Sequence, residues 1–122
     1  MIKLGNFCNE QFRFSVNLQQ GTHTHGSQVI ALHVNPRFEG GHRVIVLNSK
    51  SGSWADEKRI DGHKNPFLPG GEFLLTLRRQ ADHFDIYVNG VHLKKFKHRM
   101  SADMVDAVYI EGDVIVDRVL AI

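Results

Sequence analysis

The feature that most constrains the fold is the alternation of apolar and polar residues along short segments that end in turn residues. In residues 12–18, Phe12, Phe14, Val16 and Leu18 alternate with polar residues, which is the period of a half-buried β-strand. Comparable strand-like segments occur at residues 27–35, 42–49, 73–79, 83–88, 91–96, 106–112 and 113–122. The pattern therefore predicts many short strands rather than helices.

The turn residues between these segments favour antiparallel pairing. Asn89 and Gly90 separate two strand-like segments and both tolerate a positive φ, which is a strong signal for a tight β-hairpin. Only residues 101–107 look helical, as a short turn capped by Ser101 or Asp103. Strands do not alternate with helices as a parallel sheet requires, so we predict an all-β antiparallel sandwich or barrel.

Length and composition indicate one domain and exclude several classes of function. The 122 residues carry a formal net charge of +2, well below the basic density of a dedicated nucleic-acid binder. No apolar run is long enough to cross a membrane, and the first residues lack the pattern of a secretory signal. The single cysteine, Cys8, cannot form an internal disulfide and is expected to be structural or incidental rather than catalytic.

A basic stretch at residues 92–100 is interpreted as part of the scaffold. Its cationic residues alternate with Leu93 and Phe96, as on a strand with one solvated charged face. The alternative is a binding site for a polyanion. We expect neither nucleic-acid binding nor membrane insertion.

The segment of residues 31–41 looks like a strand with an unusual polar face. His33, Asn35 and Arg37 occupy alternate positions, so on a strand they point to the same side of the sheet. The opposite side, toward the core, is expected to carry Ile30, Leu32 and Val34. Pro36 has no N–H and is tolerated in such a strand only at a bend or an unpaired position.

A second polar group follows within a dozen residues. Asn48, Trp54, Glu57 and Arg59 lie on the next strand-like segments, and the spacing of Glu57 and Arg59 lets the two side chains hold each other. If these segments are sheet neighbours of the first row, the side chains converge on one patch. Strict alternation would turn Trp54 to the other face, so it must lie on a turn or beyond a bulge to join the patch.

The chemistry of this patch suits a sugar. A hydroxyl both donates and accepts hydrogen bonds, so it is held best between an Arg or Asn donor and a His, Asn or Glu acceptor. Arg37 can direct its donors at two neighbouring oxygens, and Glu57 can orient the guanidinium groups. An indole such as that of Trp54 can cover the aliphatic face of galactose and exclude water from it.

These residues resemble the signature of the galectin family, H-x-N-P-R, then N, then W-x-x-E-x-R. All seven side chains of the pattern are present in order: His33, Asn35, Arg37, Asn48, Trp54, Glu57 and Arg59. The resemblance extends along the whole chain, through the Asn-Gly hairpin to the "IEGDV" segment near the end. It implies a two-sheet antiparallel jelly roll, concanavalin-like in architecture, with the sugar on the concave sheet.

The resemblance also assigns roles at the matching positions. His33, Asn35 and Arg37 would bind the 4-hydroxyl of galactose, with Arg37 also reaching the ring oxygen, and Trp54 would stack on the sugar face. Residues 1–122 would then form one carbohydrate-recognition domain that binds β-galactosides of the lactose or N-acetyllactosamine type.

The remaining signature residues would extend recognition along the glycan. Asn48 and Glu57 would bind the 6-hydroxyl, while Glu57 and Arg59 would reach the 3-hydroxyl of the next sugar. No cofactor and no catalysis are expected. By resemblance, the protein would be made in the cytosol and exported without a signal peptide. A homodimer, or a partner domain lost from this chain, is a further expectation because a single shallow site binds weakly.

Two departures from the family pattern stand out. The chain starts almost at the family's second strand, so an N-terminal edge strand is expected to be absent, which would alter the usual terminal-strand dimer. The loop after Arg37 is short, and His42 in it either reaches the ligand or is an exposed loop histidine.

Three other functions are open on the residues alone. A galectin-like scaffold without sugar affinity is favoured only by the missing strand. A glycoside hydrolase needs two carboxylates about 5–9.5 Å apart, whereas the patch offers only Glu57. His23 and His25 have the spacing of metal ligands but sit in a polar loop without a third ligand nearby, and we interpret them as loop residues.

Overall fold

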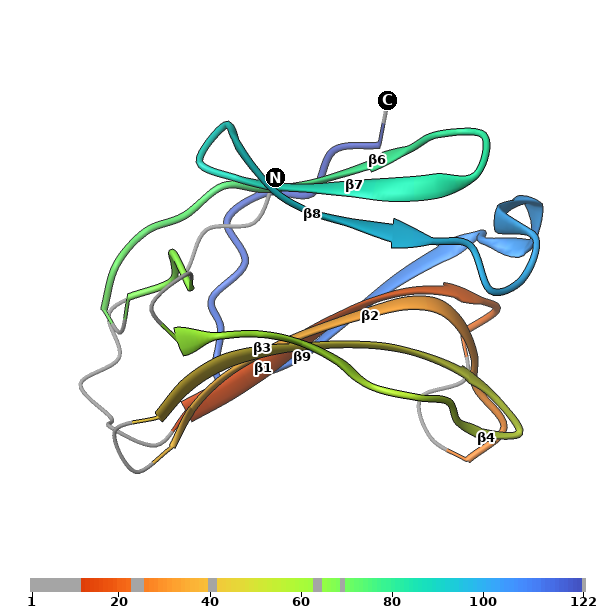
Figure 1. Ribbon diagram of the computed structural model, residues 1–122, viewed down its shortest axis with the longest axis horizontal. Coiled ribbons are helices and arrows are strands. Elements are labelled where there is room, and N and C mark those ends of the chain that lie inside the picture. The colour runs from red at the N-terminus through yellow and green to blue at the C-terminus, as the bar shows by residue number, and fades with distance from the viewer. Residues whose placement is uncertain (1–11, 23–25, 40–41, 63–64, 69, 122) are drawn as a thin grey trace.

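Two antiparallel sheets packed face to face form the protein (Figure 1). The computed structural model describes residues 12–22, 26–39, 42–62, 65–68 and 70–121, and it contains no α-helix within these ranges. The predicted all-β sandwich is thereby confirmed. The predictions for Cys8, for the N-terminal strand, for His23 and His25, and for the side chain of His42 lie outside what the structure describes.

Within the described ranges, the larger sheet has six strands. Its order is β4-β3-β2-β1-β9, and β5 pairs with β3 beside β4. The strands are β1 (Phe12–Gln20), β2 (Val29–Glu39), β3 (His42–Ser51), β4 (Ser53–Trp54), β5 (Lys58–Ile60) and β9 (Ala107–Gly112). Figure 1 shows this sheet bent so that its outer face, away from the other sheet, is concave.

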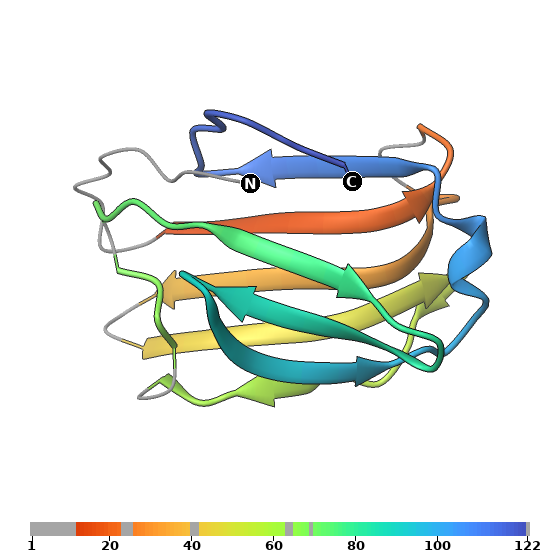
Figure 2. The same cartoon turned by 90° about the horizontal axis from the view of Figure 1, so that it is seen from above.

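In the part of the chain that the structure describes, the smaller sheet has three strands in the order β6-β7-β8, namely β6 (Leu75–Arg79), β7 (His83–Val88) and β8 (Val91–Lys97). The predicted hairpin joins β7 and β8, with φ of 52° at Asn89 and 80° at Gly90. Figure 2 shows these strands stacked over the larger sheet and running at a small angle to its strands. The predicted helical turn is the 3-10 helix η2 (Ala102–Met104), and Ser101 is its cap because its side chain accepts from the backbone N–H of Asp103.

The core lies between the two sheets and is rich in aromatic side chains. Phe14, Phe67 and Phe73 meet in one group, with ring centroids 4.6–5.7 Å apart. Aromatic contacts of this kind add to the free energy gained by burial alone. The inner face of each sheet supplies the remaining core residues, among them Val16, Leu32, Val34, Ile45, Leu47, Leu75, Phe84, Ile86 and Phe96.

The register of β2 corrects one prediction. Leu32 and Val34 face the core as expected, but a register shift between Ile30 and His33 breaks the alternation. Ala31 joins the core in place of Ile30. Ile30 is fully buried yet lies opposite Lys50 of β3. A bulge adds one residue to a strand and so changes which side chains face inward.

Two further segments differ from the simple alternation. Residues 113–122 were expected to form a strand, but residues 114–121 have no regular secondary structure. In β8 a register shift accommodates Leu93 and Phe96, which are three positions apart and both turn inward, while the lysines of the strand remain exposed. The charged stretch therefore has the solvated face that was predicted for it.

Candidate functional site

The signature residues gather on the concave face of the larger sheet, around an open cleft of about 560 Å³. Pairing in the sheet explains the convergence, because His33 of β2 lies opposite Asn48 of β3, and Arg59 of β5 lies opposite Val46 of the same strand. The signature residues that line the cleft are His33, Asn35, Arg37, Asn48, Trp54 and Glu57. Arg59 joins them through Glu57.

Pro36 explains how Asn35 is held. The pairing of β1 with β2 passes from Arg37 to Val34 without a pair at Pro36 or Asn35, so the proline is unpaired on the side of β1, although it pairs with Ile45 on the side of β3. The carbonyl of Phe14 accepts instead from Nδ2 of Asn35, at 2.7 Å. The side-chain amide thus replaces the missing backbone donor. Asn35 is 4% exposed and is fixed in one orientation.

Arg37 is positioned by that same amide. Its Nε donates to Oδ1 of Asn35 at 2.8 Å, so only the two terminal nitrogens remain for a ligand. Burial lowers the pKa of Arg37, and the neighbouring cation Arg13 lowers it further. The guanidinium still remains charged at neutral pH because its ordinary pKa is far above that range. It is a fixed cationic donor at the edge of the cleft.

His33 is held by Asn17 of β1, which the sequence had not singled out. Nδ1 of His33 lies 2.6 Å from Oδ1 of Asn17, and an amide oxygen can only accept, so Nδ1 carries the proton. Burial and, to a smaller extent, the neighbouring cation Arg37 together lower the pKa of His33 to about 4. The ring is therefore neutral at pH 7, and Nε2 is left as an acceptor.

Trp54 supplies an exposed aromatic surface beside this histidine. It lies on β4 after the Gly52 turn, and residues without regular structure separate it from β5. These residues interrupt the strand alternation, and so Trp54 can lie on the same face as Glu57. The ring centroids of Trp54 and His33 are 4.6 Å apart. The indole remains 47% exposed, far more than a core tryptophan, so one surface is available for contact. Lys50 Nζ lies 5.1 Å from the ring centroid.

Asn48 is buried at the base of the cleft and most of its hydrogen-bonding capacity is used. Nδ2 donates to the carbonyl of Ala55 at 3.0 Å, and Oδ1 accepts from the backbone N–H of Ser49 at 2.8 Å. Oδ1 also accepts from Nη1 of Arg99 at 3.0 Å. One N–H of the Asn48 amide is left for a ligand.

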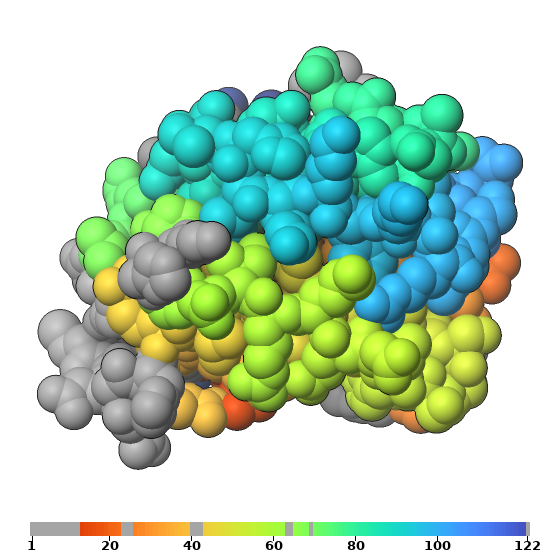
Figure 3. All heavy atoms as spheres, viewed as in Figure 1, coloured from red at the N-terminus to blue at the C-terminus, as the bar shows by residue number. Residues whose placement is uncertain are grey.

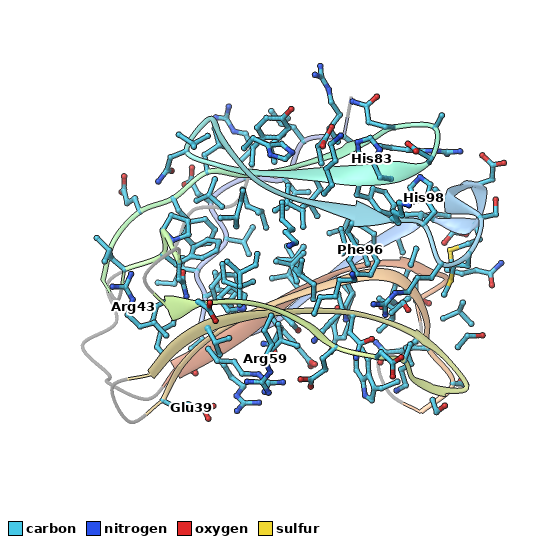
Figure 4. All side chains as sticks on the ribbon, in the orientation of Figure 1. Glu39, Arg43, Arg59, His83, Phe96 and His98 are labelled. Carbon is cyan, nitrogen blue, oxygen red and sulfur yellow. The ribbon has the colours of Figure 1, made fainter. Side chains whose placement is uncertain are left out.

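Glu57 and Arg59 form the ion pair that their spacing predicted. Both Nε and a terminal nitrogen of Arg59 donate to one oxygen of Glu57, at 3.2 and 3.1 Å. Figure 4 shows Arg59 on the outer side of the larger sheet, the side on which Glu39 also lies. The pair is substantially exposed, so it contributes little to stability and is available to a ligand.

The cleft extends beyond the signature residues onto β1 and β9. Arg13, Ser15 and Glu111 also line it, and Glu111 accepts from the hydroxyl of Tyr109 at 2.8 Å. The expectation that Glu57 is the only carboxylate of the patch is therefore wrong. The signal that could have found the β1 residues is alternation, because residues 13, 15 and 17 are the polar positions of that strand.

In the described part of the chain, His, Cys, Asp and Glu side chains form no group of three or more that could hold a metal ion. No helix in that part is long and apolar enough to cross a membrane.

The fold and the site together define a class of protein. A β-sandwich with an open polar cleft, an exposed indole and side chains fixed as single donors or acceptors is the arrangement of a lectin. The class follows from residues on four neighbouring strands rather than from any one motif.

Comparisons with known proteins give the family. The model of the galactoside-binding lectin family matches residues 2–121, so the chain belongs to that family, the galectins. Human galectin-4 is 45% identical over 103 residues, which cover 83% of this chain. The 32 kDa β-galactoside-binding lectin of Caenorhabditis elegans is 33% identical over 98% of this chain. The chain spans only 30% and 41% of the length of these two relatives, respectively.

Solved structures agree on the fold. Galectin LEC-6 of Caenorhabditis elegans superposes with a TM-score of 0.75 at 33% identity, covering 94% of this chain and 74% of that one. Sheep galectin-11, solved in complex with glycerol, superposes with a TM-score of 0.80 at 23% identity, covering 96% of this chain and 83% of that one. The jelly-roll prediction is confirmed.

Proposed function

We propose that this domain binds β-galactosides of the lactose or N-acetyllactosamine type in the cleft of the concave sheet and catalyses no reaction on them. The observation that carries the proposal is the fixed row His33, Asn35 and Arg37, with the exposed ring of Trp54 beside it. In this row a neutral ring nitrogen accepts while an amide and a guanidinium donate. Such a set matches the donor and acceptor of one sugar hydroxyl.

The orientation of the ligand follows from these roles. The 4-hydroxyl of galactose would donate to Nε2 of His33 and accept from Asn35 and Arg37. One N–H of the Asn35 amide and the terminal N–H groups of Arg37 are not used in the bonds described above. The aliphatic face of the galactose would lie on Trp54, which excludes water at small entropic cost because the ring is rigid.

The second sugar would be bound by the ion pair. The 6-hydroxyl of galactose would lie between Asn48 and Glu57, and the 3-hydroxyl of the adjoining glucose or N-acetylglucosamine between Glu57 and Arg59. Because Glu57 is already held by Arg59, a hydroxyl can bind to either partner without reorganising the other.

The second cleft carboxylate does not favour hydrolysis. Glu57 precedes β5 and Glu111 lies on β9, and four strand spacings separate β5 from β9 across β3, β2 and β1. At about 4.8 Å each, these spacings place the two backbones roughly 19 Å apart along the sheet, so the carboxylates reach the separation of about 5–9.5 Å found in hydrolytic pairs only if both side chains extend toward each other. Release of product from a chromogenic galactoside would contradict the absence of catalysis.

Calorimetric titration with lactose tests the proposal, with sucrose as the non-galactoside control. A single shallow site should give a Kd of about 0.1–1 mM, and the emission of Trp54, the only tryptophan, should shift with lactose alone. Arg37→Ala and Trp54→Ala should abolish binding while the folded spectrum is retained. A flat titration of folded wild-type protein would contradict the proposal and favour a galectin-like scaffold.

A further inference from the structure

Arg99 contacts the site from the other sheet, on the segment that follows β8. Figure 3 shows the surface of this segment, in blue, meeting that of the segment around β4, in yellow-green. We propose that Arg99 is a positioning residue for ligand recognition, which fixes the amide of Asn48 so that it presents a donor, and no acceptor, to the ligand. This inference rests on the proposed function.

The bonds around Asn48 define the orientation. Its Oδ1 accepts from the N–H of Ser49 at 2.8 Å and from Nη1 of Arg99 at 3.0 Å, which uses both lone pairs of the oxygen. Its Nδ2 donates to the carbonyl of Ala55 at 3.0 Å. A flipped amide would place its NH₂ group against a cationic guanidinium and a second N–H. Arg99 therefore stabilises one orientation with a charge-assisted bond.

Arg99 is itself held in place by the smaller sheet. Its Cζ lies 4.7 Å above the ring of Phe96, which is 1% exposed, and Nη1 also donates to Oγ of Ser49 at 3.2 Å. The adjoining residue His98 is fixed through its N–H to the carbonyl of Asp82 at 3.0 Å and through Nε2 to that of Gln80 at 2.9 Å.

These contacts connect the cleft to the other sheet. Figure 4 shows Phe96 pointing between the two sheets, with His98 on the same segment. Because Arg99 is supported by a buried ring and an anchored backbone, it meets Asn48 without a large loss of side-chain freedom on ligand binding. The effect on recognition should be confined to the ligand oxygen that Asn48 contacts, which in the proposed orientation is the 6-hydroxyl of galactose.

The test compares Arg99→Met with Lys97→Met. Methionine keeps an apolar chain over Phe96 but has no donor, and Lys97→Met removes the same charge from an exposed position on β8. The first readout needs no sugar: NMR signals of the Asn48 side-chain amide should shift in Arg99→Met and stay unchanged in Lys97→Met. The second is calorimetry with lactose and with 6′-deoxylactose, which lacks the 6-hydroxyl.

Arg99→Met should weaken lactose binding by roughly three- to tenfold, the effect of one misplaced hydrogen bond, and leave binding of 6′-deoxylactose unchanged. The inference is overturned if the Asn48 amide signals do not move, if both sugars are weakened equally, or if Lys97→Met has the same effect. Wild-type protein that binds neither sugar would refute the proposed function alone, and the amide signals would then decide the role of Arg99.

Discussion

Replacing Asn17 by Asp should make lactose binding sensitive to mild acid. Oδ1 of Asn17 lies 2.6 Å from Nδ1 of His33, so the substitution places a carboxylate at hydrogen-bonding distance from the ring without changing the shape of the side chain. A carboxylate stabilises the imidazolium form, whereas the neutral amide does not. The proton that would be gained sits on Nε2, the atom proposed to accept from the ligand.

The magnitude follows from the pKa of His33. It is about 4 in the wild type, lowered by burial and by Arg37, and an opposite charge at this distance raises a pKa by about 1 to 3. A rise of about 2 brings it to about 6. If only the neutral ring binds lactose, the Kd is divided by the neutral fraction. At pH 5 binding then weakens about elevenfold in the variant and about 1.1-fold in the wild type.

Calorimetry with lactose at pH 7.5 and pH 5 measures this difference, and an NMR titration of the His33 ring gives its pKa directly. Asn17→Ala is the control, because it removes the hydrogen bond without adding a charge, and its acid sensitivity should not exceed that of the wild type. Equal affinity of Asn17→Asp at both pH values, with a raised His33 pKa, would refute the assignment of Nε2 as an acceptor.

Three other substitutions or conditions test the account of the site and fold. Pro36→Ala restores an N–H that competes with Asn35 for the carbonyl of Phe14, so lactose binding should weaken about threefold or more; unchanged affinity by calorimetry would contradict this. The pKa of His33 is about 6.5 in the unfolded chain and about 4 in the folded chain. The contribution of this residue to the free energy of unfolding is therefore greatest above pH 6.5. The free energy of unfolding should fall by up to about 3 kcal/mol as the pH drops to 4. Urea unfolding should show a shallower decline for His33→Gln than for the wild type, and equal declines would exclude His33 protonation as the cause. Gly112→Ala should lower the urea midpoint, with a loss of about 2 kcal/mol or more, because its φ is 103° and a Cβ would meet backbone atoms of β1 at 2.6 and 2.8 Å; an unchanged midpoint would show that the turn relaxes freely.

Most of the fold could be predicted from the sequence because strand alternation and turn residues are local signals. The hairpin at Asn89 and Gly90 and the strands around it were placed within one or two residues. What could not be predicted is the effect of bulges, since an extra residue such as Ala31 changes the facing of its neighbours only in the context of a paired strand. Residues 114–121 are strand-like in sequence but form no regular secondary structure. Alternation alone does not reveal whether such a segment finds a partner strand.

The residues of the candidate site were predicted as a set because they match a family pattern. The residues that hold these side chains in place were not predicted. Asn17 lies on a different strand from His33, and Arg99 lies on the segment that follows β8 of the smaller sheet, whereas Asn48 lies in the larger sheet. Each contact depends on tertiary placement, for which a single sequence carries no local signal. The sequence could show which side chains line the cleft, but not which ones hold them.

The bonds that hold Asn35, Arg37 and Glu57 before a ligand arrives also affect how fast a ligand associates and how long the complex lasts. A cleft that is open and already ordered needs no closing step, so association should fall in the usual range of about 10⁵–10⁷ M⁻¹s⁻¹. With a Kd of about 0.1–1 mM, the complex would then last about 0.1–100 ms. A single domain of this kind would sample many glycans each second, and lasting attachment to a surface would depend on rebinding to neighbouring galactosides rather than on the strength of one contact.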